Sequence, residues 1–258
     1  MGSASRGALA VARASLGERP AASVGGELLD ASARIAAAPA LLSALADGSA
    51  DLAAKTQLIG RLFAGASVET RAVLTAAAEQ TWSSPDELVA GVEELGLRAQ
   101  AAAHADLADE LLAAASVIDS NHELELGLGS KLGDPAAKVA LVEKLFTGKI
   151  SSSALAVVAH LVADPRGRRI SAALRQSARI AADQGGSELA TVTVASALTP
   201  EQQTRLAGLL EQSAGRPVRV TTVVEPGLIG GVRIQIGDDV IDGSVRSRLE
   251  DLRLQLAG

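Results

Sequence analysis

The residues best suited to chemistry gather in one stretch near the end of the chain, EPGLIGGVRIQIGDDVIDGS at residues 225–244. Glycine-rich loops can bind phosphate, and clustered aspartates can hold a hard cation. A phosphate loop needs a helix N-terminus behind it, but the glycines of residues 227–231 precede an apolar, strand-like run. The chain contains no GxxxxGK[ST] or GxGxxG motif. We therefore expect no phosphate site here.

The aspartates of the same stretch are Asp238, Asp239 and Asp242. Their spacing does not match a DxDxDG calcium loop, and the glutamate that such a loop carries at its twelfth position is missing. The sequence Gly237-Asp238-Asp239 is typical of a hairpin turn, because glycine and aspartate tolerate the backbone angles of tight turns. We expect a turn, and an enzyme that binds a cation through these carboxylates is the alternative.

Other candidate catalytic groups are scattered along the chain. His104, His122 and His160 form no HExxH motif, and Ser153 and Ser171 lie in helical patterns without a partnered base. No set of nucleophile, base and orienting group can be assembled from these residues. We expect no catalytic residue, no metal site and no cofactor, in a protein that works through its surfaces.

Composition narrows the class of protein. The chain has 258 residues, of which 48% are apolar, with a net charge of −6, no cysteine, and only Phe63 and Phe146 as phenylalanines. An acidic chain with few aromatic residues is a poor candidate for nucleic-acid binding. The basic run Pro165–Arg169 is predicted to be a solvated helix start. The sequence offers no membrane-spanning run and no signal peptide, so we expect a soluble cytosolic protein that reaches membranes only through a partner.

An internal repeat covers much of the chain. The segment Glu27–Gly65 aligns without gaps with Glu110–Gly148, and fifteen of 39 positions are identical. The two phenylalanines, Phe63 and Phe146, fall opposite each other. Each copy has the apolar spacing of helices, with Asp134 as an N-cap in the second copy. A lone helical hairpin cannot bury its apolar stripe, so we predict two small bundles, at residues 1–100 and 101–186.

The join between the copies is open to two interpretations. A helix that begins at Ser84 either continues through residues 94–114 or breaks at Gly91 and Gly96. In the first copy, a helix is predicted to end at Gly65. In the second copy, the corresponding helix is predicted to end at the aligned glycine, Gly148. Gly185 and Gly186 are predicted to end the last helix of the second copy.

The period of the pattern changes after residue 186. Residues 189–194 alternate as a strand does, and Thr199 with Pro200 opens a helix. Further strands are predicted at residues 218–224, 232–236 and 240–241, before a last helix capped by Asp242 or Ser244. Residues 187–258 therefore form a strand–helix–strand–strand–strand–helix module. The predicted fold class is mainly α, with tandem helical repeats followed by this small α/β domain.

The stretch 227–256, GLIGGVRIQIGDDVIDGSVRSRLEDLRLQL, resembles the C-terminal signature of the delta subunit of F-type ATP synthases, a relative of the oligomycin-sensitivity-conferring subunit. The matching positions are Leu228, Gly230, Gly231, Val232, Ile236, Gly237, Asp242, Gly243, Ser244 and Leu249. The glycine pair, the strand, the Gly-Asp turn and the Ile-Asp-Gly-Ser segment follow one another in register. The resemblance implies that this module binds the peripheral stalk.

A second stretch, KVALVEKLFTGK at residues 138–149, is similar to the helical domain of the same family. Its matching positions are Lys138, Leu141, Leu145, Phe146, Gly148 and Lys149. The first copy departs from the pattern with Ala66 where Lys149 stands, and the chain lacks the tyrosine usual near the family's N-terminus. The extra length resembles the long delta subunits of high-GC Gram-positive bacteria.

The resemblance implies a non-catalytic stator subunit on the cytoplasmic side of the membrane. Its partners would be the N-terminal helices of the alpha subunits in the catalytic head and the C-terminal end of the stalk subunit b. An adaptor built from helical repeats, unrelated to the synthase, is the alternative. The sequence does not decide which helical copy contacts the head.

Overall fold

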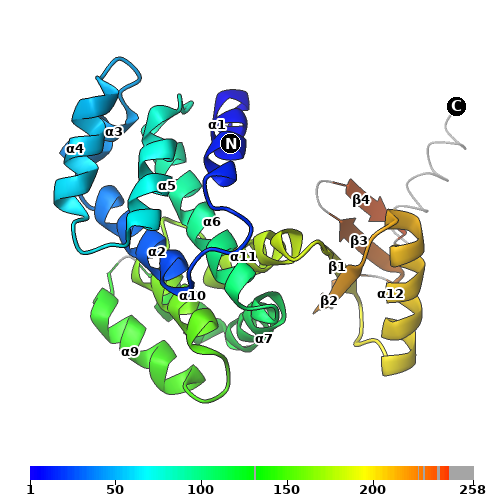
Figure 1. The fold of residues 1–258 in the computed structure, drawn as a ribbon. Helices are drawn as coiled ribbons and strands as arrows, with labels where there is room; N and C mark the ends of the chain where they lie inside the picture. Colours follow the sequence, from blue (N-terminus) through cyan, green and yellow to red (C-terminus); the bar gives the residue numbers. More distant parts are fainter. Residues whose placement is uncertain (131, 226, 229, 237–238, 244–258) are drawn as a thin grey trace, which may run out of the picture. The chain divides into compact units, whose positions relative to one another are not determined.

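The computed structural model describes residues 1–130, 132–225, 227–228, 230–236 and 239–243. The chain divides into two compact units, Met1–Ala181 and Ala182–Gly258. The first unit is helical, and the second contains a mixed sheet and a helix (Figure 1). The predicted fold class is confirmed.

Eleven helices belong to the described part of the helical region, and α11 extends over the division between the units. Their bounds are α1 Ser3–Ala14, α2 Ala22–Ala36, α3 Pro39–Ala46, α4 Leu52–Leu62, α5 Val68–Glu79, α6 Pro85–Ala103, α7 Leu107–Asp119, α8 His122–Gly129, α9 Pro135–Phe146, α10 Ser152–Ala163 and α11 Ile170–Gln184.

Helix bounds repeat along the chain with the spacing of the sequence repeat. Helix α3 shifted by 83 residues gives the bounds of α8, and the start of α4 shifted in the same way gives the start of α9. Phe63 and Phe146 are both 3% exposed. The aligned segments therefore fold into the same succession of helices, with the two phenylalanines buried at equivalent places.

Helix α6 joins the two copies as one continuous helix. It runs through Gly91 and Gly96, packs against α1, α2, α3, α5 and α7, and ends before His104. The interpretation that the helix extends to residue 114 is wrong, since α7 begins at Leu107. The predicted border between residues 100 and 101 falls inside α6, and the division into two separate bundles stays a prediction.

The second unit has a four-stranded sheet in the order β2-β1-β3-β4. Its strands are β1 Glu188–Val194, β2 Val218–Val224, β3 Val232–Ile236 and β4 Asp239–Asp242, and α12 Pro200–Ala214 connects β1 to β2. β1 pairs parallel with β2 and antiparallel with β3, and β3 pairs antiparallel with β4. The apolar side of α12 packs on the sheet, and Leu210, Val192 and Ile234 belong to one core.

Local signals set both ends of α12, and its start at Thr199 and Pro200 is as predicted. Thr199 and Gln202 form a reciprocal capping box, Pro200 is the first helical residue, and Gly215 ends the helix with a φ of 68°. Gly186, with a φ of 74°, likewise follows the end of α11.

No single helix among the described residues is long and apolar enough to cross a bilayer. Taken together, α2 and α3 are long and apolar enough to do so by length and composition only. The chain bends by 107° between these two helices.

Candidate binding surfaces

Candidate catalytic residues do not converge in the part of the chain that the structure describes. No group of three or more His, Asp or Glu side chains there is arranged to hold a metal ion. Asp242 of β4 accepts a hydrogen bond from Arg233 Nε at 3.2 Å, and Asp238 lies outside the described residues. Ile236 pairs with Asp239 across β3 and β4, so the predicted hairpin brings these two strands together.

The C-terminal signature residues shape the start of β3 and the end of β4. Gly230 and Gly231 have φ angles of 138° and 85°, which side chains disfavour. Val232 pairs with Val194, and Ile236 pairs with Ala190.

The backbone around these strands is closely hydrogen-bonded. The N–H of Leu228 donates to the carbonyl of Glu225 at 3.0 Å, and the N–H of Gly243 donates to the carbonyl of Val232 at 2.9 Å. Three signature residues, Gly237, Ser244 and Leu249, lie outside the described residues, as does the predicted last helix. The described signature residues build the sheet, and their role as a family signature for stalk binding stays a prediction.

The helical signature combines buried and exposed positions. Lys138 is buried and its Nζ donates a hydrogen bond to the carbonyl of Ser130, while Phe146 lies in the interior. Leu145 is half-buried, and Leu141 is 48% exposed. Gly148 has a φ of 76°, and the exposed Lys149 follows it. The prediction that this helix ends at Gly148 is wrong, since α9 ends at Phe146 with Thr147 as its C-cap, and Leu141 and Lys149 remain accessible.

The first copy repeats part of this arrangement. Lys55 is buried like Lys138, and its Nζ donates to the carbonyl of Ala78 at 2.8 Å. The prediction that this helix ends at Gly65 is wrong, since α4 ends at Leu62, with Phe63 as its C-cap. The backbone N–H of Phe63 bonds to the carbonyl of Ile59, which ends the helix before the glycine.

A matching pair of polar contacts appears at the starts of α5 and α10. Ser67 caps α5 and donates from N and Oγ to Glu27 at 2.9 and 2.7 Å. Ser151 caps α10 and donates from N and Oγ to Glu110 at 3.0 and 2.5 Å. Each carboxylate ties the second helix of its copy to the fifth. The paired serines show that α10 follows α5 by 84 residues.

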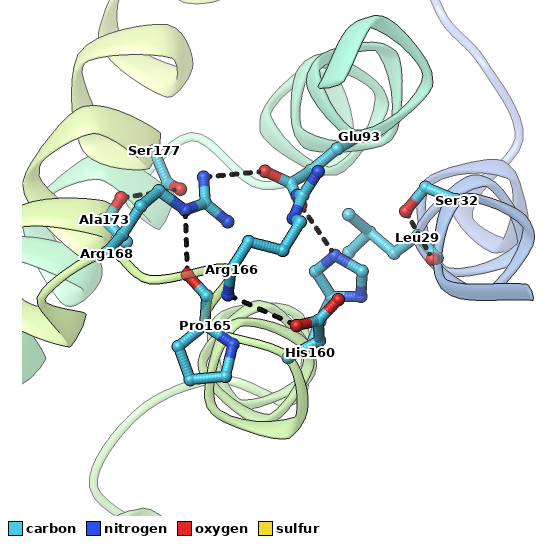
Figure 2. A network of polar contacts seen from close by, with 10 residues as sticks. Leu29, Ser32, Glu93, His160, Pro165, Arg166, Arg168, Ala173 and Ser177 are labelled. Carbon is cyan, nitrogen blue, oxygen red and sulfur yellow. Dashed lines mark hydrogen bonds and ion pairs between the residues drawn. The ribbon is translucent and has the colours of Figure 1, made fainter. Parts of the chain in front are cut away.

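A buried carboxylate on α6 is the centre of a polar network that sequence reasoning missed (Figure 2). The Glu93 side chain is 7% exposed and pairs with Arg166, and its Oε1 accepts from Arg168 Nη1 at 3.1 Å. His160 Nε2 of α10 lies 3.0 Å from Glu93 Oε2. The network therefore ties α6 to α10 and to the loop before α11.

Burial controls the protonation of His160 in this network. Burial, aided by the positive charge of Arg168, lowers the pKa of His160 to about 4. The imidazole is therefore neutral near pH 7 and can donate its Nε2 proton to the carboxylate of Glu93. The prediction that residues 165–169 are a solvated helix start is wrong, because Arg166 and Arg168 point to this buried acid. The sequence showed the basic run but not the distant acid that it faces.

A second feature is an open hollow between α4 and α5 of the first copy. Its volume is about 460 Å³. Ile59 and Gly60 of α4 and Val68, Ala72 and Ala76 of α5 line it, and we call it the α4–α5 hollow. Val68 at its edge is 75% exposed. Thr56, Arg71, Thr75 and Glu79 also line it, so the hollow combines apolar and polar side chains.

Together, a helical unit and a small α/β unit, each with its own core, define a two-unit protein that is mainly α with a C-terminal mixed sheet. The sequence profile described as "ATP synthase delta (OSCP) subunit" matches residues 95–256. The chain belongs to this family, whose delta subunits are non-catalytic parts of the ATP synthase. The predicted resemblance is confirmed, and an adaptor unrelated to the synthase is excluded.

Individual delta subunits are similar in sequence to this chain over most of its length. It is 43% identical to the ATP synthase subunit delta of Leifsonia xyli, over 100% of both chains. It is 38% identical to that of Nocardia farcinica, over 92% of this chain and 90% of the relative. It is 34% identical to that of Streptomyces coelicolor, over 100% of this chain and 98% of the relative. The first helical copy is therefore also present in relatives of similar length.

Proposed function

We propose that the chain is a stator subunit in the peripheral stalk of a rotary ATP synthase. It links the N-terminal helices of the alpha subunits, in the catalytic head, to the C-terminal end of the b subunit. By resisting the torque of the rotor it keeps the head from turning, and it works on the cytoplasmic side of the membrane.

The observation that carries this proposal is the division of a delta-family chain into two compact units. The helical unit has a core that includes Leu28, Phe63 and Leu95. The second unit has a separate core, with Val192 and Leu210. A link under torque needs two firm attachments, and two units with separate cores can each supply one.

The helical unit is the proposed attachment to the head. Amphipathic helices bind in apolar grooves of helical proteins, and the helical unit is where the described chain has the α4–α5 hollow. The second unit, with its delta-like glycine pair, is the proposed attachment to subunit b.

The experiment is a binding assay with a shortened chain that lacks residues 187–258. We expect it to bind the detached catalytic head with unchanged affinity and to lose binding to the b subunit. The full chain, which should bind both, is the control. A shortened chain that still binds b would contradict the assignment of the two attachments.

A further inference from the structure

The turn that leads from α11 into the sheet is short. Two glycines follow the helix, and β1 begins at Glu188, two residues after the second glycine. The N–H of Gly186 donates to the carbonyl of Asp183 at 3.1 Å, and the N–H of Ser187 donates to the carbonyl of Ala182 at 2.9 Å. These two bonds are those of a helix C-cap that ends at a left-handed glycine. The backbone alone therefore closes the turn on the side of the helix.

Arg216 reaches both sides of this turn. It lies in the segment between α12 and β2, and its Nε and Nη2 donate to the two carboxylate oxygens of Glu188 at 3.1 and 2.7 Å. Its Nη1 lies 4.0 Å from Oδ1 of Asp183, in the last turn of α11. A guanidinium that binds a carboxylate with two parallel hydrogen bonds has a fixed orientation. The pair with Glu188 therefore aims the remaining nitrogen of Arg216 at the end of the helix.

The start of β1 is bonded to the same segment in two further ways. The N–H of Glu188 donates to the carbonyl of Pro217 at 2.8 Å. Arg219 Nε donates to Oγ of Ser187 at 3.4 Å, and Ser187 is 7% exposed. These bonds fix the strand end of the turn, so the base that carries Arg216 does not depend on its ion pairs.

The ionic contacts themselves are open to water. The side chains of Arg216 and Asp183 are 45% and 44% exposed, and that of Glu188 is 20% exposed. Salt weakens ion pairs between exposed charges, whereas the backbone bonds of the cap carry no net charge. The contact between the helix end and the sheet should therefore respond to ionic strength.

We propose that Arg216, Glu188 and Asp183 form an ionic clasp that restrains the two-glycine turn between α11 and β1. While the clasp is closed, the last turn of α11 and the start of β1 move together. When it opens, the two glycines let the turn bend, because glycine has the widest choice of backbone angles.

The position of the clasp gives it a consequence for the whole chain. Helix α11 begins in the helical unit, and all three clasp residues belong to the unit Ala182–Gly258. The clasp therefore limits bending at the place where the chain passes from one unit to the next. This inference concerns the chain alone and does not depend on the proposed stator role.

The test measures amide hydrogen exchange of the full chain at low and high salt concentration. The amide of Ser187 reports opening of the turn, and the amide of the buried Val192 in β1 reports wider unfolding of the sheet. Arg216→Gln removes the clasp. Arg205→Gln is the matched control, because Arg205 is an exposed arginine on α12.

Two more variants test the contact with α11. Asp183→Asn and the double variant Asp183→Asn with Arg216→Gln complete a double-mutant cycle with the unaltered chain and Arg216→Gln. The cycle separates the Arg216–Asp183 contact from any effect that Asp183 has on the end of its own helix.

We expect Arg216→Gln to speed exchange at Ser187 by about two- to fivefold, as loss of an exposed ion pair would, and to leave exchange at Val192 unchanged. Arg205→Gln should exchange like the unaltered chain. High salt should speed exchange at Ser187 in the unaltered chain and have little effect in Arg216→Gln. Arg216→Gln should also have a smaller effect when Asp183→Asn is already present.

Three results would overturn the clasp. The first is an unchanged exchange rate at Ser187 in Arg216→Gln. The second is equally faster exchange at Ser187 and Val192, because Arg216 would then stabilise the sheet as a whole. The third is an undiminished effect of Arg216→Gln in the presence of Asp183→Asn, because the arginine would then not act on α11.

Discussion

Glu93 shows how a single side chain can tie together helices that are far apart in the sequence. It lies on α6, and its partners come from α10 and from the loop that follows α10. Taking a carboxylate out of water is costly unless cations and hydrogen bonds compensate, and here two arginines and a histidine do so. The sequence could not predict this network, because Glu93 and Arg166 are far apart in the chain and nothing local links them.

The first prediction at this scale concerns Glu93 itself. Glu93→Gln removes the negative charge and leaves Arg166 and Arg168 partly buried without their acid. Breaking a buried pair from one side costs about 3 kcal/mol or more of unfolding free energy. Urea unfolding measures this, with Arg169→Gln as the control, because Arg169 is 69% exposed and its pair with Asp119 contributes about 1 kcal/mol or less. Equal effects of the two substitutions would contradict the account.

The second prediction follows from the lowered pKa of His160. The pKa of His160 is about 4 in the folded chain and about 6.5 in an unfolded one. Between pH 4 and pH 6.5 the unfolded state therefore binds a proton on this histidine that the folded state does not bind. Stability is therefore fully present above pH 6.5 and falls as the pH drops toward 4. Between pH 7 and pH 5 this histidine should account for a loss of about 2 kcal/mol.

The measurement compares urea unfolding of the unaltered chain and of His160→Gln at pH 7 and pH 5. The variant should lose about 2 kcal/mol less on acidification, whereas His122→Gln, at an exposed position, should behave like the unaltered chain. The same acid loss in His160→Gln would show that the imidazole is not held neutral.

The third prediction uses the paired phenylalanines. Phe63 and Phe146 are equally buried, so truncating either one to alanine should cost about 3–5 kcal/mol. Leu141→Ala on α9 is the control, because Leu141 is 48% exposed and its truncation should cost far less. Urea unfolding gives the values. A small effect at either phenylalanine would mean that the two sites are not equivalent parts of the core.

At the scale of elements, sequence patterns predicted the four described strands and several of the helices, but they left open a break at glycines inside a helix. A break in α6 at Gly91 or Gly96 was one of two interpretations, because glycine disfavours helix interiors. In the structure, a Cβ at Gly91 would lie 2.2 Å from the Trp82 ring, and one at Gly96 would lie 3.1 Å from the carbonyl of Gly25. These glycines serve close packing, which only the tertiary structure reveals.

The C-terminal strands were easier to predict, because their signals are local. Alternating residues in β1 and β2, and the cap residues around α12, indicate their structures without knowledge of distant contacts. The contact between α2 and α10 was not predictable in this way, because the repeated sequence alone does not show which helices of the two copies meet.

The prediction at this scale concerns the crossing of α2 and α6. A Cβ at Gly25 would lie 2.8 Å from the backbone N of Gln100, whereas one at the neighbouring Gly26 would meet no atom closer than 3.8 Å. Gly25→Ala should therefore lower the melting temperature. Gly26→Ala should keep or raise it, because alanine favours helices by up to about 1 kcal/mol. Thermal unfolding of both variants is the measurement, and a loss at Gly26 equal to that at Gly25 would contradict the close crossing.

At the scale of the whole molecule, the proposed stator role places mechanical load on both units. Each unit has its own core, and the delta subunits of this family are non-catalytic. Two attachments in series transmit no more torque than the weaker one allows. Losing one attachment should therefore abolish coupling and not halve it, whereas the chemistry of the catalytic head should continue.

The measurement that tests the stator role most directly is ATP synthesis by reconstituted membranes that contain the chain without residues 187–258. We predict that a proton gradient drives no ATP synthesis in these membranes, while ATP hydrolysis by the detached head continues at its normal rate. Membranes with the full chain, which should synthesise ATP, are the control. Normal ATP synthesis with the shortened chain would contradict the stator role.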